Sequence, residues 1–182
     1  MACSETQMES LNEQNKELKS HKHKLYDNWT IWAHLPHDTD WTFKSYKNIM
    51  TINTVEEALT LIETLPEKMI KNCMLFLMRD GIQPTWEDER NRNGGCFSYK
   101  VPNKIVTTTW KQLSYILMGE TLTKDLNLRP TINGITISPK KNFCIIKIWL
   151  STCEFQNPKK IIEVSGSIIA QGCLFKKHIP EY

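Results

Sequence analysis

Residues 73–78, Cys-Met-Leu-Phe-Leu-Met, form an uninterrupted apolar run that is followed by the turn residues Asp80-Gly81. A strand with one face in water alternates apolar and polar side chains, whereas a strand covered on both faces is apolar throughout. A run of this length, closed by a turn signal, is typical of a strand. It therefore predicts a central strand with other parts of the chain packed on both of its faces.

Extended segments flank this run on both sides. Apolar residues from Trp29 to Ala33 alternate with other residues, which predicts a strand with aromatic side chains on both faces. The remaining predictions are an extended segment at 43–52, strands at 132–137 and 143–151 joined by a turn at 138–142, and a closing strand at 173–179. Asn93-Gly94-Gly95 has the composition of a hairpin turn.

Capping residues predict three helices. Thr54 and Glu57 form a capping box, and Pro66 ends the helix that follows. A second helix is predicted from near Thr109 to Gly119, and a third from Asn157-Pro158 to Gly172. The chain begins with strands, and the helices that follow are separated from one another by one or two strands. This order predicts an α+β fold, in which a curved antiparallel sheet has helices packed on one face.

The first 24 residues differ from the rest of the chain. Residues 1–24 mix Glu with Lys, Gln, Asn and Ser and contain few large apolar side chains, which predicts a disordered polar tail before one domain at 25–182. No apolar run approaches the ~18 residues of a membrane span, and no signal peptide is evident. These features predict a cytoplasmic protein.

Charge narrows the classes of partner. The 23 Lys and Arg residues against 20 Asp and Glu give a net charge of +3. This balance excludes a strongly basic protein that coats nucleic-acid duplexes, but it leaves room for a small anionic ligand.

The six cysteines are scattered without a CxxC pair, which predicts free thiols in a reducing compartment. His34 and His37 could be metal ligands, but Pro36 breaks the helix that would align them, and no second ligand pair stands out. We predict no metal site and no cofactor.

Two of the six tryptophans, Trp41 and Trp86, fall in predicted loops, where packing does not ordinarily demand an indole. Each could simply cover an edge of the core. Two indoles can also hold a planar base between them, and such stacking contributes roughly 1–3 kcal/mol of binding free energy per base. If the base is cationic, cation–π attraction contributes up to ~2 kcal/mol more. Glu87 could accept hydrogen bonds from N1–H and N2–H₂ of guanine. The pattern favours a purine site.

The Trp86 segment resembles the signature of the eukaryotic translation initiation factor 4E family of mRNA cap-binding proteins. The similar residues are Asp80-Gly81-Ile82, the run Trp-Glu-Asp-Glu-Arg-Asn at 86–91, Gly94-Gly95, and, between Leu25 and Gly172, Trp29, Trp32, Val55-Glu56-Glu57, Trp110 and Ile148-Trp149. The resemblance implies three helices packed on the convex face of the sheet and a cap-binding cleft on its concave side.

The resemblance also implies roles for the tryptophans. Trp41 and Trp86 would sandwich the 7-methylguanine base, and Glu87 would bind its N1 and N2 edge. The backbone N–H of Trp86 would reach O6, and Trp149 would contact the methyl group. Trp29, Trp32 and Trp110 would be structural.

The phosphate site departs from the family. Ser138 stands where the family usually has Arg, and Cys96 occupies another basic position. Lys140 and Lys141 are the predicted substitutes for binding the triphosphate, although they could also form a solvated turn. Because the sequence stops at Tyr182, we expect the family's C-terminal loop over the cap phosphates to be absent or much reduced.

The surface that binds partner proteins also departs from the family pattern. Leu59 stands where the family has Trp, Lys111 and Tyr115 replace apolar residues, and Lys24 replaces Pro. A lysine in a groove for an apolar peptide carries a desolvation cost, so either the common scaffold motif binds weakly or a dedicated partner exists. The predicted partner-binding residues are His23, Leu25, Val55, Leu59, Lys111 and Tyr115.

The leading hypothesis is a non-enzymatic protein that binds capped mRNA and recruits it for translation initiation through a scaffold protein. The alternative is a cap-binding repressor that does not recruit the scaffold. A third hypothesis from another class is a metal-dependent hydrolase of nucleotides. It would use His34, His37, Glu87, Asp88 and Glu89.

The chain contains many Ile, Lys and Asn residues, which suggests an AT-rich genome. Together with the changed partner surface, this composition suggests a viral or parasitic origin. A viral protein of this kind would act in the host cytoplasm.

Overall fold

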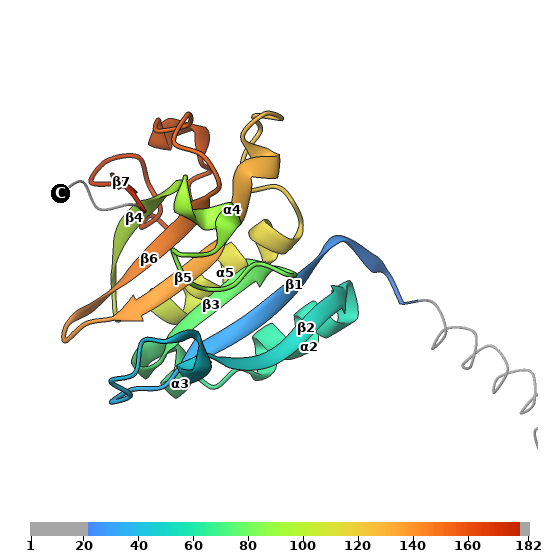
Figure 1. Ribbon diagram of the computed structural model, residues 1–182, viewed down its shortest axis with the longest axis vertical. Helices are drawn as coiled ribbons and strands as arrows, with labels where there is room; N and C mark the ends of the chain where they lie inside the picture. The colour runs from blue at the N-terminus through green and yellow to red at the C-terminus, as the bar shows by residue number, and fades with distance from the viewer. Residues whose placement is uncertain (1–21, 179–182) are drawn as a thin grey trace, which may run out of the picture.

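The computed structural model describes residues 22–178, and the predicted tail at 1–24 falls almost wholly outside them. Within this part of the chain, seven strands form one antiparallel sheet (Figure 1). The strands are β1 (Lys24–His34), β2 (Lys47–Thr54), β3 (Met74–Arg79), β4 (Gly95–Pro102), β5 (Ile132–Pro139), β6 (Phe143–Leu150) and β7 (Leu174–Lys177). Their spatial order is β2-β1-β3-β5-β6-β4-β7.

The apolar run at 73–78 forms β3, an interior strand between β1 and β5. Leu75 and Leu77 belong to the main core under the helices, whereas Phe76 and Met78 belong to a second apolar cluster. Successive side chains of a strand point to opposite faces. The prediction of a strand covered on both faces is therefore confirmed.

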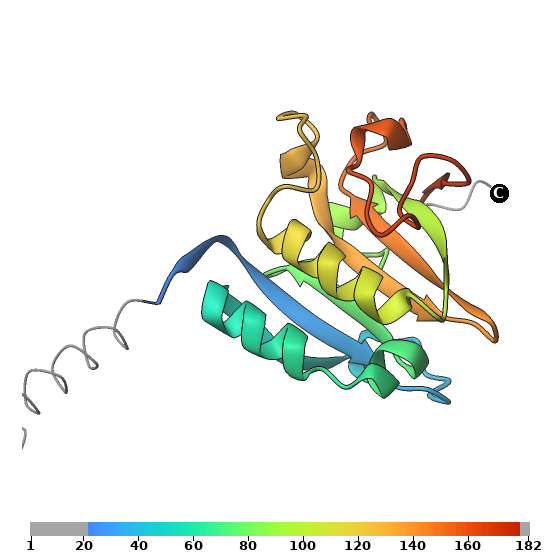
Figure 2. The same ribbon diagram turned by 180° about the vertical axis from the view of Figure 1, so that it is seen from behind.

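Three helices cover the convex face of the curved sheet (Figure 2). They are α2 (Val55–Thr64), α3 (Glu67–Asn72) and α5 (Val106–Met118). The capping box of α2 forms, because Thr54 accepts a hydrogen bond from the Glu57 N–H at 3.3 Å. The Glu57 carboxylate in turn accepts from the Asn53 N–H at 2.9 Å.

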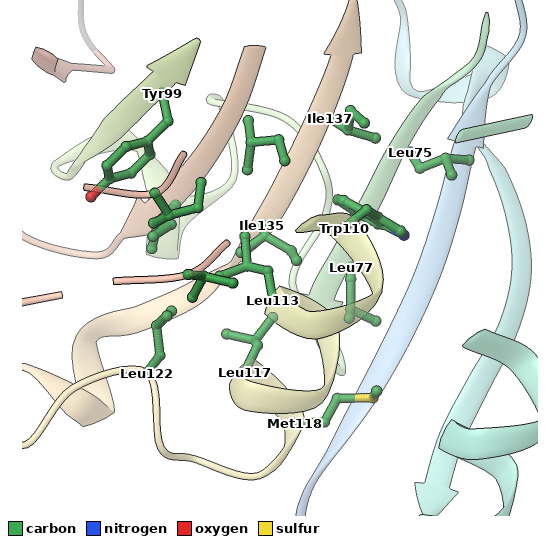
Figure 3. Packing of buried hydrophobic residues seen from close by; sticks show 14 of the residues in the cluster. Leu75, Leu77, Tyr99, Trp110, Leu113, Leu117, Met118, Leu122, Ile135 and Ile137 are labelled. Atoms are coloured by element: carbon green, nitrogen blue, oxygen red, sulfur yellow. The ribbon is translucent and has the colours of Figure 1, made fainter. Parts of the chain in front are cut away.

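The main core lies between these helices and the sheet. On α5, Trp110, Leu113 and Leu117 point toward Leu77 of β3 and Ile135 of β5 (Figure 3). Trp29 and Trp110 are completely buried, so their structural role is confirmed. Trp32 is half-buried and packs against the second apolar cluster.

The predicted third helix at 157–172 is wrong. That segment holds only a short 3-10 turn, η3 (Pro158–Lys160), and isolated bridges pair Thr123 with Ile161 and Val164 with Ile168. Ser165 and Gly166 adopt left-handed backbone conformations, φ 51° and 63°, which no α-helix accommodates. Ile161 and Ile168 are buried by this looped path rather than by a helix. The third helix is instead α3, directly after Pro66.

Other boundaries differ in smaller ways. The helix α5 begins at Val106 rather than near Thr109, and 43–52 opens with a 3-10 turn, η1 (Phe43–Ser45), before β2. A further 3-10 turn, η2 (Arg129–Thr131), precedes β5. Asn93-Gly94-Gly95 is no hairpin turn, because it joins a short helix, α4 (Glu89–Arg92), to β4. A Cβ on Gly94 would lie 1.8 Å from the Leu150 carbonyl oxygen, so backbone contact explains this glycine.

No helix among residues 22–178 has the length and apolar character needed to cross a membrane. The five cysteines in this range are free thiols, and Cys73, Cys96 and Cys144 are buried. Cys3 lies outside the described residues.

Candidate functional site

The face of the sheet opposite the helices, here called the open face, turns toward the viewer in Figure 1. The strand register sets its side chains in rows. In one row Trp32 of β1 pairs with Phe76 of β3, Phe76 with Thr136 of β5, Thr136 with Lys147 of β6, and Lys147 with Ser98 of β4. Phe76, Met78, Ile82 and Trp149 form the apolar floor of this face.

Trp41 lies in the loop after β1, and its side chain is 58% exposed. The buried ring of His34 stacks on the indole, with ring centroids 4.2 Å apart and planes 4° from parallel. His34 Nε2 lies 2.9 Å from the Asp40 carbonyl oxygen, which can only accept, so Nε2 carries the proton. This bond fixes the imidazole, and the imidazole in turn supports one side of Trp41.

The second exposed indole, Trp86, lies in the loop between β3 and α4 and is 44% exposed. Asn91, which is completely buried, holds this loop. Its amide nitrogen donates to the carbonyl oxygens of Gln83 at 3.0 Å and Thr85 at 2.8 Å. Its amide oxygen accepts from Asn133 of β5 at 2.8 Å. The loop is thus fixed to the sheet just before Trp86.

The carboxylates that follow Trp86 have different surroundings. Asp88 is the N-cap of α4 and accepts from the backbone N–H groups of Gln83 at 2.8 Å and Arg90 at 2.9 Å. Glu87 is exposed and makes no ion pair with any described residue. Its backbone carbonyl accepts from Arg92 at 3.0 Å, so the main chain is held while the carboxylate stays available.

Tyr46 connects the two loops. Its ring meets His34 and Phe76 edge-on, with centroids 5.3 Å apart in each pair. Burial raises the pKa of the Tyr46 phenol, and the negative charge of Glu87 raises it further. Tyr46 also packs against the cluster that includes Ile82, at the start of the loop that bears Trp86. Both loops border the same part of the open face.

Trp149 ends the apolar floor on the β6 side and is only 7% exposed. Its indole lies against His178, with ring centroids 4.5 Å apart. His178 Nδ1 is 2.8 Å from the Asn91 carbonyl oxygen, to which it donates. The residue after β7 is thereby tied to the segment that holds Trp86.

The predicted phosphate-binding residues Lys140 and Lys141 are exposed in the turn between β5 and β6, at the tip of a projecting hairpin (Figure 1). Lys141 precedes Trp149 by eight residues, nearly the whole of β6. At about 3.3 Å per residue, that separation is on the order of 26 Å. Ser138 lies near the same end of the hairpin, half-buried.

The predicted partner residues belong to β1 and the residue before it, to α2 and to α5. Both helices lie on the side of the sheet opposite the open face, here called the helical face (Figure 2). His23 accepts from the Val55 N–H through its carbonyl at 2.8 Å, and its ring bonds Glu56 at 2.7 Å. Leu25 is half-buried against the core, whereas Val55 and Leu59 are exposed.

Glu63 on α2 joins the two substituted positions on α5, a contact that sequence reasoning missed. Lys111 donates to one carboxylate oxygen at 2.7 Å, and the Tyr115 hydroxyl donates to the other at 2.6 Å. The Lys111 and Tyr115 bonds lower the pKa of Glu63. Burial and the Glu63 contact raise the pKa of Tyr115 to about 12. A polar network therefore links α2 to α5 on the helical side of the sheet.

Among residues 22–178, no three His, Cys, Asp or Glu side chains are placed to share a metal ion. Of the residues named for a metal-dependent hydrolase, His34 is committed to Trp41 and Asp40, and Asp88 to capping α4. His37 is exposed in the loop after β1. The structure thus gives Glu87 a free carboxylate but does not gather these residues into one centre.

Comparison with known proteins places this architecture in a family. The sequence pattern of a family described as Eukaryotic initiation factor 4E matches residues 24–178. A eukaryotic translation initiation factor 4E homolog of Acanthamoeba polyphaga mimivirus is 30% identical over 136 residues, covering 63% of this chain and 50% of that protein. The chain thus spans about half the length of the mimivirus relative. The Candida albicans eukaryotic translation initiation factor 4E is 27% identical over 159 residues, 82% of this chain and 74% of that one.

Solved structures share the fold. A schistosome eIF4E complexed with m7GpppG and 4E-BP superposes with a TM-score of 0.67 at 22% identity, covering 74% of this chain and 75% of that one. Ascaris suum eIF4E-3 with m7G cap gives a TM-score of 0.66 at 22% identity, covering 75% and 77%. The family match extends from the start of β1 to His178 and includes both aromatic loops. The chain belongs to the eukaryotic initiation factor 4E family.

Proposed function

We propose that this chain binds the 7-methylguanosine cap of mRNA on its open face and delivers the mRNA to translation initiation. The observation that carries the proposal is the pair of exposed indoles, Trp41 and Trp86, on loops that border one aromatic patch. Each loop is held by a buried side chain, His34 or Asn91. Large exposed aromatics that the fold keeps in place suit stacking on a planar ligand.

The ligand's charge fits the site. Methylation at N7 makes guanine cationic, and an indole face attracts a cation by up to ~2 kcal/mol in a dry site. The free carboxylate of Glu87 would accept hydrogen bonds from N1–H and N2–H₂ of the base, while the backbone N–H of Trp86 would donate to O6. Trp149, in the floor, would contact the methyl group. Complexes of schistosome eIF4E with m7GpppG and of Ascaris suum eIF4E-3 with m7G cap support this choice of ligand.

Calorimetric titration with 7-methylguanosine triphosphate and with GTP tests the proposal. The methylated nucleotide should bind much more tightly, and Trp41→Ala or Trp86→Ala should cost more than ~2 kcal/mol, the scale of a lost stacking partner. Trp86→Phe is the matched control, since it keeps an aromatic face and should lose less. Equal binding of both nucleotides, or wild-type affinity in either alanine variant, would contradict a sandwich around a cationic base.

The helical face would receive a scaffold protein of the initiation complex or a diverged equivalent. Related structures contain a 4E-BP or the 4E-binding protein Mextli. Exposed Val55 and Leu59 provide an apolar patch for such a partner.

A repressor that holds the cap without recruiting the scaffold is the second candidate, favoured by the Glu63–Lys111–Tyr115 network across that face. Capture on this protein from a lysate containing capped mRNA separates the two functions. Recovery of a scaffold and helicase complex supports initiation, whereas recovery of mRNA without them supports repression.

The proposed activity is binding without chemical turnover, in the cytoplasm, or in the host cytoplasm for a viral protein. Glu87 serves in it as a hydrogen-bond acceptor rather than as a metal ligand. Incubation of a cap analogue with the protein and divalent cations should leave the analogue intact, and cleavage would revive the hydrolase hypothesis.

A further inference from the structure

The register of the sheet places two lysines, Lys147 and Lys176, near Trp149. Trp149 of β6 pairs with Cys96 of β4, and Cys96 pairs with Lys176 of β7. Paired residues of antiparallel strands point to the same face, so Lys176 shares the open face with Trp149. Lys147 lies two residues before Trp149 on β6 and therefore points to that face as well.

The spacing is that of a compact site. Strands are about 4.8 Å apart, so Lys176 begins roughly 10 Å from Trp149, across β4. Lys147 is one pleat away along β6, about 7 Å. Both are far closer to Trp149 than the hairpin turn that carries Lys140 and Lys141.

The positive charges of Lys147 and Lys176 both act on the Cys96 thiol. Burial raises the pKa of this thiol, and the positive charges of Lys147 and Lys176 act against that rise. Neither lysine forms an ion pair with a carboxylate among residues 22–178. Lys147 is half-buried, so its unpaired charge carries a desolvation cost that a bound anion would offset.

Buried polar atoms around the two lysines also lack partners. Thr136, 1% exposed, pairs with Lys147 in the register, and its hydroxyl makes no hydrogen bond within the described chain. The same holds for Nε1 of Trp149. Buried polar groups are ordinarily hydrogen-bonded. The Thr136 hydroxyl and the Trp149 N–H can both donate, and beside two unpaired ammonium groups they mark a place for a negatively charged ligand.

We propose that Lys147 and Lys176, with the hydroxyls of Thr136 and Ser98, bind the phosphate chain of the nucleotide whose base the two indoles hold. This inference rests on the proposed function, because the base fixes where the phosphates begin. It moves the phosphate contacts from the β5–β6 turn to the middle of the sheet. Cys96 and Ser138 then need not be basic, since the charge enters from neighbouring strands.

The test compares ligands that differ in phosphate number. Wild type, Lys147→Gln, Lys176→Gln and the double variant are titrated with 7-methylguanosine, its 5′-monophosphate and its 5′-triphosphate. The double variant should lose about tenfold or more in triphosphate affinity but less than about twofold for the nucleoside, and its salt dependence should become shallower by about 0.7 to 1 per lost contact. Lys68→Gln on α3 makes the same charge change on the helical face and should change nothing.

Two results would overturn this inference and leave the proposed function intact. One is wild-type triphosphate affinity in the double variant with an unaltered melting temperature. The other is a phosphate-dependent loss in a Lys140→Gln, Lys141→Gln double variant and not in the Lys147, Lys176 one.

A parallel titration with unmethylated GTP separates this inference from the proposed function. If wild type does not prefer the methylated nucleotide, the proposed function fails, while a phosphate-dependent loss in the double variant still supports the anion site. Absence of binding to every phosphorylated probe overturns both.

Discussion

The imidazole of His34 lies parallel to the indole of Trp41, 4.2 Å away between ring centroids. His34 is 2% exposed and Trp41 is 58% exposed, so a buried ring supports an exposed one. One side of the indole is occupied by the protein, which leaves the other side for a ligand. A support of this kind reduces the ordering cost of binding, because the indole is already held.

Removing the support should weaken cap binding without removing the indole. His34→Ala is expected to lower the affinity for 7-methylguanosine triphosphate about 3- to 10-fold, the range of an aromatic pair energy. Calorimetry measures the change. His37→Asn in the same loop is the control, because His37 is exposed and Asn tolerates its positive φ. Wild-type affinity in a folded His34→Ala variant would show that the stack has no part in binding.

Asn91 should matter for both stability and binding. Asn91→Ala leaves the carbonyls of Gln83 and Thr85 without their donor, and a buried group without its partner costs about 1–3 kcal/mol. We expect a loss of about 2–3 kcal/mol in the free energy of unfolding by urea, with weaker cap binding because the Trp86 loop is released. Asn93→Ala, an exposed neighbour, should leave both quantities nearly unchanged. A variant with unaltered stability would contradict the role of Asn91 as a loop anchor.

His178 should make the fold sensitive to mild acid. Burial lowers its pKa below the usual 6.5, the Asn91 bond opposes this shift, and the positive charge of Lys147 adds to it. Because the folded-state pKa lies below the unfolded value, the unfolded chain takes up the proton first as pH falls. The stabilisation is therefore complete above the unfolded pKa and declines as pH falls through the folded pKa.

Thermal melting of wild type and His178→Gln between pH 7.5 and 5.5 checks this sign. The melting temperature of wild type should fall further than that of the variant. Parallel curves would mean that His178 does not contribute to the acid sensitivity in this range.

The polar network on the helical face should govern partner choice. Lys111→Leu removes the charge that an apolar peptide must desolvate, so affinity for a helical peptide from a 4E-binding protein should rise about tenfold. Fluorescence anisotropy of a labelled peptide measures it. Lys68→Leu on α3 controls for a general gain in hydrophobicity. An unchanged or reduced affinity would show that Lys111 contributes to the natural partner contact instead.

The central part of the fold was predictable because its signals are local. The apolar run of β3 and the capping box of α2 each appear in a few adjacent residues, and both predictions are confirmed. The prediction for 157–172 failed because Asn157-Pro158 and Gly172 resemble helix ends, whereas Ile161 and Ile168 are buried by a looped path. Only the backbone at Ser165 and Gly166 separates the two possibilities, and a single sequence does not display it.

The sequence indicated the exposed residues of the candidate site but not the residues that support them. Trp41 and Trp86 were identifiable because tryptophan is unusual in a loop. Nothing in the sequence indicates the stacking of His34 on Trp41 or the hydrogen bond between Asn133 and Asn91. The anion site had a weak signal. Lys147 and Trp149 share strand parity, yet placing Lys176 beside them requires the pairing of β4 with β7, which depends on tertiary structure.

The hydrogen bond between His178 and Asn91 has a consequence for the order of events during synthesis. The two residues are 87 positions apart, so the loop that bears Trp86 leaves the ribosome long before its last anchor exists. At about 5–20 residues per second, the delay is roughly 4–17 s. During that interval a nascent chain has the indole but lacks β7 and the histidine that ties the loop in place. The segment that bears Trp86 therefore gains this hydrogen bond late, after nearly all of the residues between Trp86 and His178 have emerged.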